Sequence, residues 1–128
     1  MEISVGMTGS VSTAVEREDT ALEVGSGSLL VYATPCMVAL MEGAACEAIA
    51  QALPEDKTSV GTELYVSHLS ATPVGMEVRA EAEITEVDGN AITFRVTAYD
   101  ESGKIGEGTH KRYIVTSQRF LDKTYSKL

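Results

Sequence analysis

The chain has 128 residues, a formal net charge of −9, 44% apolar residues and 23% charged residues. These values indicate one folded domain over residues 1–128 rather than a disordered chain, and the acidic balance argues against nucleic acid as a partner because phosphates require a basic surface. No apolar run reaches the roughly 18 residues of a membrane span, and the acidic start Met1–Ser4 is unlike a secretory signal, so we expect a cytoplasmic protein with no membrane association.

The first elements in chain order are a weak strand, a loop and one long helix. Residues Thr8–Val15 are predicted to form a weak strand. The Gly/Ser-containing segment Glu16–Tyr32 is interpreted only as a loop. The helix is predicted over Pro35–Leu53, with Thr34 as its N-cap, a proline at its first position and Pro54 directly after its end. It is apolar on most sides, which predicts a buried helix.

Four strands joined mostly by tight turns follow the helix. Their alternation is typical of an antiparallel sheet with one buried face. Because the helix is the only element able to cover that face, we expect the α+β class and the hotdog fold, in which a curved antiparallel sheet wraps one long central helix. A cystatin-like or other one-helix sheet is the alternative topology. The strand segments are Val60–Leu69, Met76–Val87, Ala91–Asp100 and Lys104–Thr116, with turns at Asp88–Asn90 and Glu101–Gly103.

The two cysteines do not indicate a disulfide or a metal site. Cys36 and Cys46 lie on the same predicted helix, about 15 Å apart at its usual rise, which is too far for a disulfide. With no CxxC motif and only two histidines in the chain, metal binding is not expected either. We expect reduced cysteines and no cofactor.

Glu42 and His68 are both placed against the pattern of their elements. At 100° per residue, Glu42 lies in the middle of an apolar stripe, where a charged carboxylate is costly unless it is paired. His68 shares the phase of the apolar residues of its strand and faces the same core. Together they could form an acid/base pair near neutral pH. A structural ion pair for Glu42 and a core histidine for His68 are the alternatives.

Three further side chains are candidates. Besides capping the helix, Thr34 adds a hydroxyl at a helix start, where unpaired N–H groups favour a developing oxyanion, although it lies about two turns from Glu42. His110 and Arg112 lie on one side of the last long strand, where a solvated strand edge is the alternative.

Several segments resemble, in order and with similar spacing, the motifs of the fluoroacetyl-CoA thioesterase group. Ala33–Glu42 (ATPCMVALME) resembles the motif at the helix start, and Val60–Thr62 and Val66–Gly75 (VSHLSATPVG) resemble the next two. Gly106–Arg112 (GEGTHKR) resembles the last. The resemblance runs from about Ala33 to Phe120.

The resemblance implies a homodimeric hotdog thioesterase with active sites near the dimer interface and without a metal or redox cofactor. It implies Thr34, Glu42 and His68 as catalytic residues and Gly61 and Arg112 as substrate-binding residues, and we add His110 to the second group. The fluoroacetyl branch has a longer, aromatic segment before the helix, whereas this chain has no Phe and one Tyr there. The resemblance therefore implies thioester hydrolysis without implying selectivity for fluoroacetate.

The main hypothesis is an enzyme that hydrolyses a short or small acyl-CoA to the free acid and coenzyme A. Glu42 would act as base or nucleophile, directly or through a water, while His68 moves protons and Thr34 orients the attacking group or assists acyl transfer. The alternative is a non-catalytic acyl-CoA or small-acid binding module on the same fold. A hotdog hydratase is less favoured, because no Asp precedes a His at short spacing in the helix region.

Overall fold

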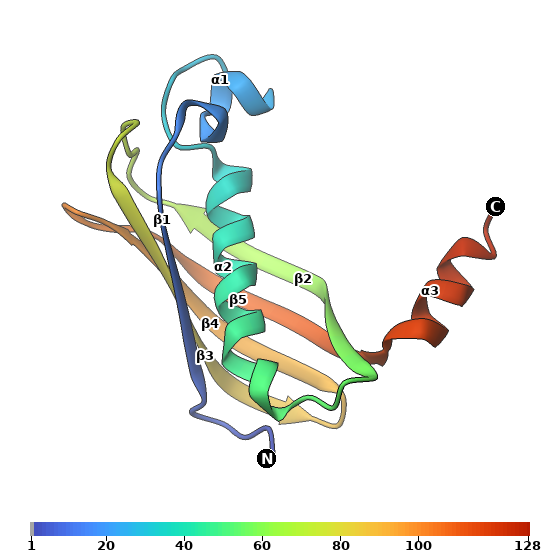
Figure 1. Cartoon of the computed structure of the whole chain (residues 1–128). Coiled ribbons are helices and arrows are strands. Elements are labelled where there is room, and N and C mark those ends of the chain that lie inside the picture. Colours follow the sequence, from blue (N-terminus) through green and yellow to red (C-terminus); the bar gives the residue numbers. More distant parts are fainter. Residues whose placement is uncertain (1) are drawn as a thin grey trace.

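The computed structural model describes residues 2–128, and in it a curved five-stranded antiparallel sheet wraps one long helix (Figure 1). The central helix, α2, is the longest helix and lies against the concave face of the sheet. The elements are β1 (Thr8–Ala14), η1 (Arg17–Asp19), α1 (Ala21–Val24), α2 (Thr34–Ile49), η2 (Ala50–Ala52), β2 (Lys57–His68), β3 (Glu77–Asp88), β4 (Ala91–Asp100), β5 (Gly103–Thr116) and α3 (Ser117–Tyr125).

The strand order in the sheet is β1-β3-β4-β5-β2, and all neighbours are antiparallel. Strands β3, β4 and β5 follow one another through short turns, as the sequence predicts. Gly89, in the first of these turns, has a φ of 61°, a conformation that glycine adopts without strain. The sheet therefore has two edges, formed by β1 on one side and β2 on the other.

The core lies between α2 and the concave face of β3 and β4. Small residues on the helix let it approach the sheet closely. At Gly9 on β1 a side chain would collide with the backbone of Ala44 and Ala48, so only glycine fits there. The buried helix residues are Met37, Met41, Ala44, Ala45, Ala48 and Ile49, and they pack against sheet residues that include Val78, Ala80, Ala82, Ile84, Ile92, Phe94, Val96 and Ala98.

The predicted N-cap of the helix is wrong by one residue. Helix α2 begins at Thr34 itself, and Ala33 is its N-cap because the Ala33 carbonyl accepts the N–H of Met37 at 3.0 Å. Pro35 therefore takes the second helical position. The Thr34 side chain makes no capping bond, which leaves its hydroxyl free for another partner.

The predicted end of the helix also differs. The α-helix stops at Ile49, and a 3₁₀ turn over Ala50–Ala52 continues it to Leu53. Tightening of the last turn into a 3₁₀ helix is frequent at helix ends. Two short helices, η1 and α1, occupy the segment interpreted as a loop, and α3 was not predicted. Within residues 2–128, no helix is long and apolar enough to cross a membrane.

Candidate active site

The first part of the candidate site lies where α2 begins and β2 ends. Thr34 Oγ1 and His68 Nδ1 are 2.7 Å apart and form a hydrogen bond. Both residues line a cleft of about 320 Å³ together with Ala21, Tyr32 and Ser70. Thr34 is exposed and His68 is half-buried, so a small ligand in the cleft can reach both.

The pKa of His68 is lowered, which favours the neutral imidazole near pH 7. Burial lowers its pKa from the ordinary value of 6.5, although the nearby backbone of Ser70 opposes this shift. If the neutral ring accepts the Thr34 hydroxyl proton at Nδ1, its own hydrogen is on Nε2. Nε2 is buried, and no group of residues 2–128 meets the geometry of a hydrogen bond to it. The backbone of Ser70 is the hydrogen-bond partner that raises the His68 pKa, so this N–H has only a weak acceptor within residues 2–128.

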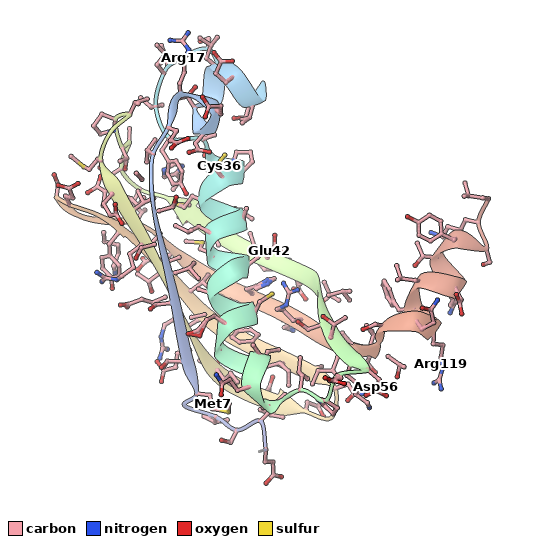
Figure 2. All side chains as sticks on the ribbon, viewed as in Figure 1. Met7, Arg17, Cys36, Glu42, Asp56 and Arg119 are labelled. Atoms are coloured by element: carbon pink, nitrogen blue, oxygen red, sulfur yellow. The ribbon has the colours of Figure 1, made fainter. Side chains whose placement is uncertain are left out.

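The second part of the site surrounds Glu42, on the side of α2 that faces β2 (Figure 2). The predicted position in the middle of a buried stripe is wrong, because the Glu42 side chain is 40% exposed. The buried face of the helix is centred on Met41, and at 100° per residue Glu42 lies at its margin. Cys46, one turn further along the same side of the helix, is exposed as well. The edge strand β2 covers this side of the helix only in part.

Glu42 is paired with a buried arginine. Arg112 Nη1 donates to Glu42 Oε2 at 3.4 Å. The same guanidinium donates from Nε to Ser59 Oγ at 2.8 Å and from Nη2 to the Ser59 carbonyl at 3.0 Å. The Arg112 side chain is only 8% exposed, so these acceptors replace the water that its charge would otherwise bind.

His110 fixes the remaining side of Arg112. Arg112 Nη1 lies 3.1 Å from His110 Nε2 and can only donate, so Nε2 accepts. The other ring nitrogen, Nδ1, then carries the hydrogen and donates it to the Glu63 carbonyl at 2.9 Å. Burial is the main cause that lowers the pKa of His110, and the Arg112 charge lowers it further, against the opposing effect of the Glu63 carbonyl and Glu42. His110 is therefore neutral and 1% exposed.

Gly61 completes this cluster. A Cβ atom at Gly61 would lie 2.6 Å from Glu42 Oε2, 3.2 Å from His110 Cε1 and 3.3 Å from Arg112 Nη1. The glycine therefore leaves room for the carboxylate beside the strand. A register shift between Gly61 and Glu63 interrupts the pairing of β2 with β5 at this point.

The predicted site residues thus fall into two groups within one chain. Thr34 and His68 form one, and Glu42, Gly61, His110 and Arg112 form the other. Eight residues of helix, about 12 Å along its axis, separate Thr34 from Glu42, and no ion pair joins Glu42 to His68 in residues 2–128. The roles of all six residues remain predictions.

The sequence analysis missed Ser59, which binds Arg112 twice. A polar residue two positions before Gly61 on the same strand was the available signal. Lys111, which lies between His110 and Arg112, points away from the cluster and pairs with Glu63 at 3.7 Å. No group of three or more His, Cys, Asp or Glu side chains suited to a metal ion occurs in residues 2–128.

Comparison with known proteins identifies the family. The family model described as fluoroacetyl-CoA-specific thioesterase matches residues 15–118. The chain belongs to this family. The fluoroacetyl-CoA thioesterase of Streptantibioticus cattleyicolor is 40% identical to it over 97 residues, which cover 76% of this chain and 70% of that protein. Membership of this thioesterase family confirms the prediction of a thioester hydrolase.

Solved structures related to this family have the same fold. That of the fluoroacetyl-CoA thioesterase FlK superimposes with a TM-score of 0.94 at 32% identity, covering 100% of this chain and 99% of that one. A thioesterase superfamily member from Thermus thermophilus gives 0.85 at 30% identity over 99% and 98% of the two chains. A hot-dog-like protein from Thermanaerovibrio acidaminovorans gives 0.86 at 22% identity over 97% and 92%, which shows the fold alone. The predicted hotdog fold is confirmed.

Proposed function

We propose that the protein hydrolyses short or small acyl-CoA thioesters to the free acid and coenzyme A, as one hotdog domain that works as a homodimer. The observation that carries this proposal is the 2.7 Å contact between the Thr34 hydroxyl and the His68 imidazole. The lowered pKa of His68 keeps that imidazole uncharged near pH 7 and therefore able to accept a proton. An alcohol held against a neutral imidazole is an arrangement suited to nucleophilic acyl transfer.

In the proposed reaction, Thr34 Oγ1 attacks the thioester carbonyl while its proton passes to His68 Nδ1. The carbon–sulfur bond breaks, coenzyme A takes the proton and leaves as a thiol, and the acyl group remains on Thr34 as an ester. Water then attacks the ester with His68 as base, and the free acid is released. The positive end of the α2 dipole lies beside Thr34, where it stabilises the oxyanion.

The walls of the cleft favour a small acyl group. Besides Thr34 and His68, the cleft is lined largely by small side chains such as Ala21, Ser26 and Ala71. The segment Glu16–Tyr32 contributes a single aromatic residue, Tyr32, which is only 3% exposed. We therefore expect acetyl-CoA and similar substrates to be turned over faster than palmitoyl-CoA in a thiol-release assay, without selectivity for fluoroacetyl-CoA. Faster turnover of the long-chain substrate would contradict this pocket assignment.

The homodimer is proposed from the open edge of β2 and from the His68 and Glu42 side chains beside it. Strand β2 is a 12-residue edge strand whose outer backbone groups have no neighbouring strand, a surface that invites pairing with another chain. Within residues 2–128, His68 Nε2 has only the Ser70 backbone as a weak acceptor, and Glu42 is a half-exposed carboxylate. A two-fold pairing of β2 edges would bring Glu42 of one protomer toward the partner's His68. We assign Glu42 to orienting that imidazole and stabilising its charged form.

Mixing two inactive variants tests this shared site. Glu42→Gln and His68→Ala homodimers should each lose on the order of 10²–10⁴ in kcat. In a heterodimer of the two, one site combines the intact Glu42 of one chain with the intact His68 of the other. Equal mixing after unfolding and refolding should therefore restore about a quarter of the parent activity, because about half of the dimers are mixed and each holds one intact site. Mixing Glu42→Gln with itself is the control, and no recovery in the mixed sample would place both residues in one chain.

The binding-only alternative is distinguished by the amount of product. A module that binds acyl-CoA without turnover releases no more than one equivalent of thiol per chain. The proposed enzyme releases thiol continuously under excess substrate. A cytoplasmic location remains a prediction of the sequence, with which the two free cysteines agree, because reduced thiols are typical of that compartment.

A further inference from the structure

The chain is acidic but contains ten Lys and Arg side chains, and only some of them form ion pairs with carboxylates. Six of them form an ion pair with a carboxylate within residues 2–128, namely Arg17, Arg79, Arg95, Lys104, Lys111 and Arg112. The other four form none there, and they are Lys57, Arg119, Lys123 and Lys127. In the fold these four come from the start of β2 and from α3 and the residues after it.

These two segments meet at one corner of the molecule. Lys57 pairs with Thr116 at the end of β5, and the N–H of Ser117 donates to the Asp56 carbonyl at 2.9 Å. Helix α3 leaves the sheet at this point and projects beyond the β2 edge (Figure 1). Arg119 and Asp56, both labelled in Figure 2, mark the corner. The fold therefore gathers these unpaired cations at one corner, where, within the described residues 2–128, Asp56 and Asp122 also lie without forming an ion pair with them.

The corner contains a cleft of about 320 Å³. Three of the four unpaired cations line it, and no carboxylate does. Two aromatic rings line it as well, from Tyr113 on β5 and Phe120 on α3, and these side chains are 45% and 41% exposed. The cationic members are Lys57, Arg119 and Lys123.

We propose that this corner cleft binds the phosphorylated nucleotide of coenzyme A. Cations that line one cleft without forming an ion pair repel one another, and phosphate groups would relieve that repulsion with charge-assisted hydrogen bonds. The exposed rings offer flat apolar surface for a purine base. Four residues of strand, about 13 Å, separate Lys57 from Gly61, which lies beside Glu42, and an extended pantetheine arm exceeds that distance. His68 of the same chain lies eleven residues from Lys57, about 36 Å, so the cleft would serve the site that the proposed dimer forms between Glu42 and the partner's His68. This inference rests on the proposed function, because it takes the bound thioester to be an acyl-CoA.

An anionic membrane surface is the other ligand that a basic amphipathic helix fits. Helix α3 also exposes Leu121 and Tyr125, which suits such a surface. Two observations favour the nucleotide. Phe120 lines the same cleft as the cations and Tyr113 of the sheet, and the net charge of −9 acts more strongly against an extended anionic surface than against a small ligand held in one cleft.

The test compares two substrates and one direct probe. A triple variant, Lys57→Gln with Arg119→Gln and Lys123→Gln, is matched by Lys104→Gln, which removes a cation far from the cleft. The ratio of kcat/KM for acetyl-CoA to that for S-acetylpantetheine, which lacks the nucleotide, should fall at least about tenfold in the triple variant and stay constant in the control. Binding of adenosine 3′,5′-bisphosphate to the parent protein, measured by calorimetry, should be lost in the triple variant only.

The outcomes separate this inference from the proposed function. If the parent protein hydrolyses neither substrate, the proposed function is rejected, and the calorimetric result decides alone whether the nucleotide cleft exists. An unchanged substrate ratio, or bisphosphate binding that survives the triple substitution, overturns the inference. Cation-dependent binding to phosphatidylserine vesicles without bisphosphate binding overturns it in favour of a membrane surface.

Discussion

Thr34 differs from most threonines at a helix start because its hydroxyl bonds to an imidazole rather than to the helix backbone. The cap is supplied by Ala33, so replacing the Thr34 side chain removes no capping bond. Thr34 is also exposed, and little packing depends on it. A substitution at Thr34 should therefore lower the reaction rate without lowering the stability of the fold.

We predict that Thr34→Ala lowers kcat by roughly 10²–10⁴-fold and leaves the melting temperature unchanged. Thr34→Ser keeps a hydroxyl in reach of His68 Nδ1 and should retain activity within about tenfold of the parent. Steady-state thiol release with acetyl-CoA measures the first effect, and thermal unfolding measures the second. Near-parent turnover by Thr34→Ala would remove the hydroxyl from the reaction.

The lowered pKa values of the two histidines predict how the stability of the fold depends on pH. Burial lowers the pKa values of His68 and His110 in the folded chain from the ordinary 6.5, so the unfolded chain binds more protons below that pH. Their contribution to stability is therefore fully present above about pH 6.5 and is lost as the pH falls through the folded pKa values. The melting temperature should decrease between about pH 7.5 and pH 5.5, and the decrease should be smaller in His68→Gln. A flat profile in the parent would contradict the burial of both rings.

The catalytic activity should also depend on pH over this range. The proposed reaction requires His68 without its second proton, so kcat/KM should be level near neutral pH and fall on the acid side with an apparent pKa below 6.5. An acid limb centred above 6.5 would show that the carboxylate of the partner's Glu42, which favours the charged imidazole, outweighs this burial.

At the scale of elements, β2 passes so close to α2 at Gly61 that an added side chain would displace the Glu42 carboxylate. Gly61→Ala would place a Cβ 2.6 Å from the Glu42 carboxylate and push it away from Arg112. We predict a loss of activity on the order of 10²-fold, because small displacements of catalytic groups have effects of this size. Comparing acetyl-CoA turnover of the variant and the parent measures it.

Gly43→Ala is the matched control for this substitution. Gly43 lies within α2, and its added Cβ would meet Val11 Cγ2 at 3.7 Å, an ordinary contact. Alanine is favoured over glycine in a helix, so stability should rise by about 0.5–1 kcal/mol with activity retained. Equal losses in both variants would show that the effect at Gly61 is not specific to the site.

Periodicity and turn residues predicted the elements well because both are local signals. The strand Ala91–Asp100 was predicted with its observed bounds, and the first strand differs by one residue. The short helices η1 and α1 were missed, because each is a single turn with no periodic pattern. The long helix was placed correctly except at its ends, where the Ala33 cap and the 3₁₀ turn depend on backbone contacts that side-chain patterns do not report.

The site was less predictable because it depends on how elements pack. The burial predicted for Glu42 assumed that the sheet covers the helix on all apolar sides, whereas β2 covers the Glu42 side only in part. The contact between Thr34 and His68 requires that one strand end meet the helix start, which no local pattern encodes. The motif resemblance selected these residues without giving their distances.

At the scale of the whole molecule, the two edges of the sheet differ in how well other elements cover them. Strand β1 packs beside α2, which approaches it closely at Gly9, whereas β2 is covered less and carries His68 at its end. We predict a particle of twice the 13.6 kDa chain mass in light scattering at micromolar concentration. A mass of one chain would reject the homodimer and the shared site with it.

The strand order also determines when the protein becomes active during folding. Strands β3, β4 and β5 are joined by short turns, whereas Thr8 must find Glu83 and Lys57 must find Thr116 across long stretches of chain. Because such distant pairings require costly loop closure, the meander forms first and the edge strands join later. His68 ends an edge strand and meets Thr34 only when that strand and α2 are both in place. In refolding experiments, thiol release should therefore return more slowly than the far-ultraviolet circular dichroism of the sheet, and a single shared rate would contradict this order.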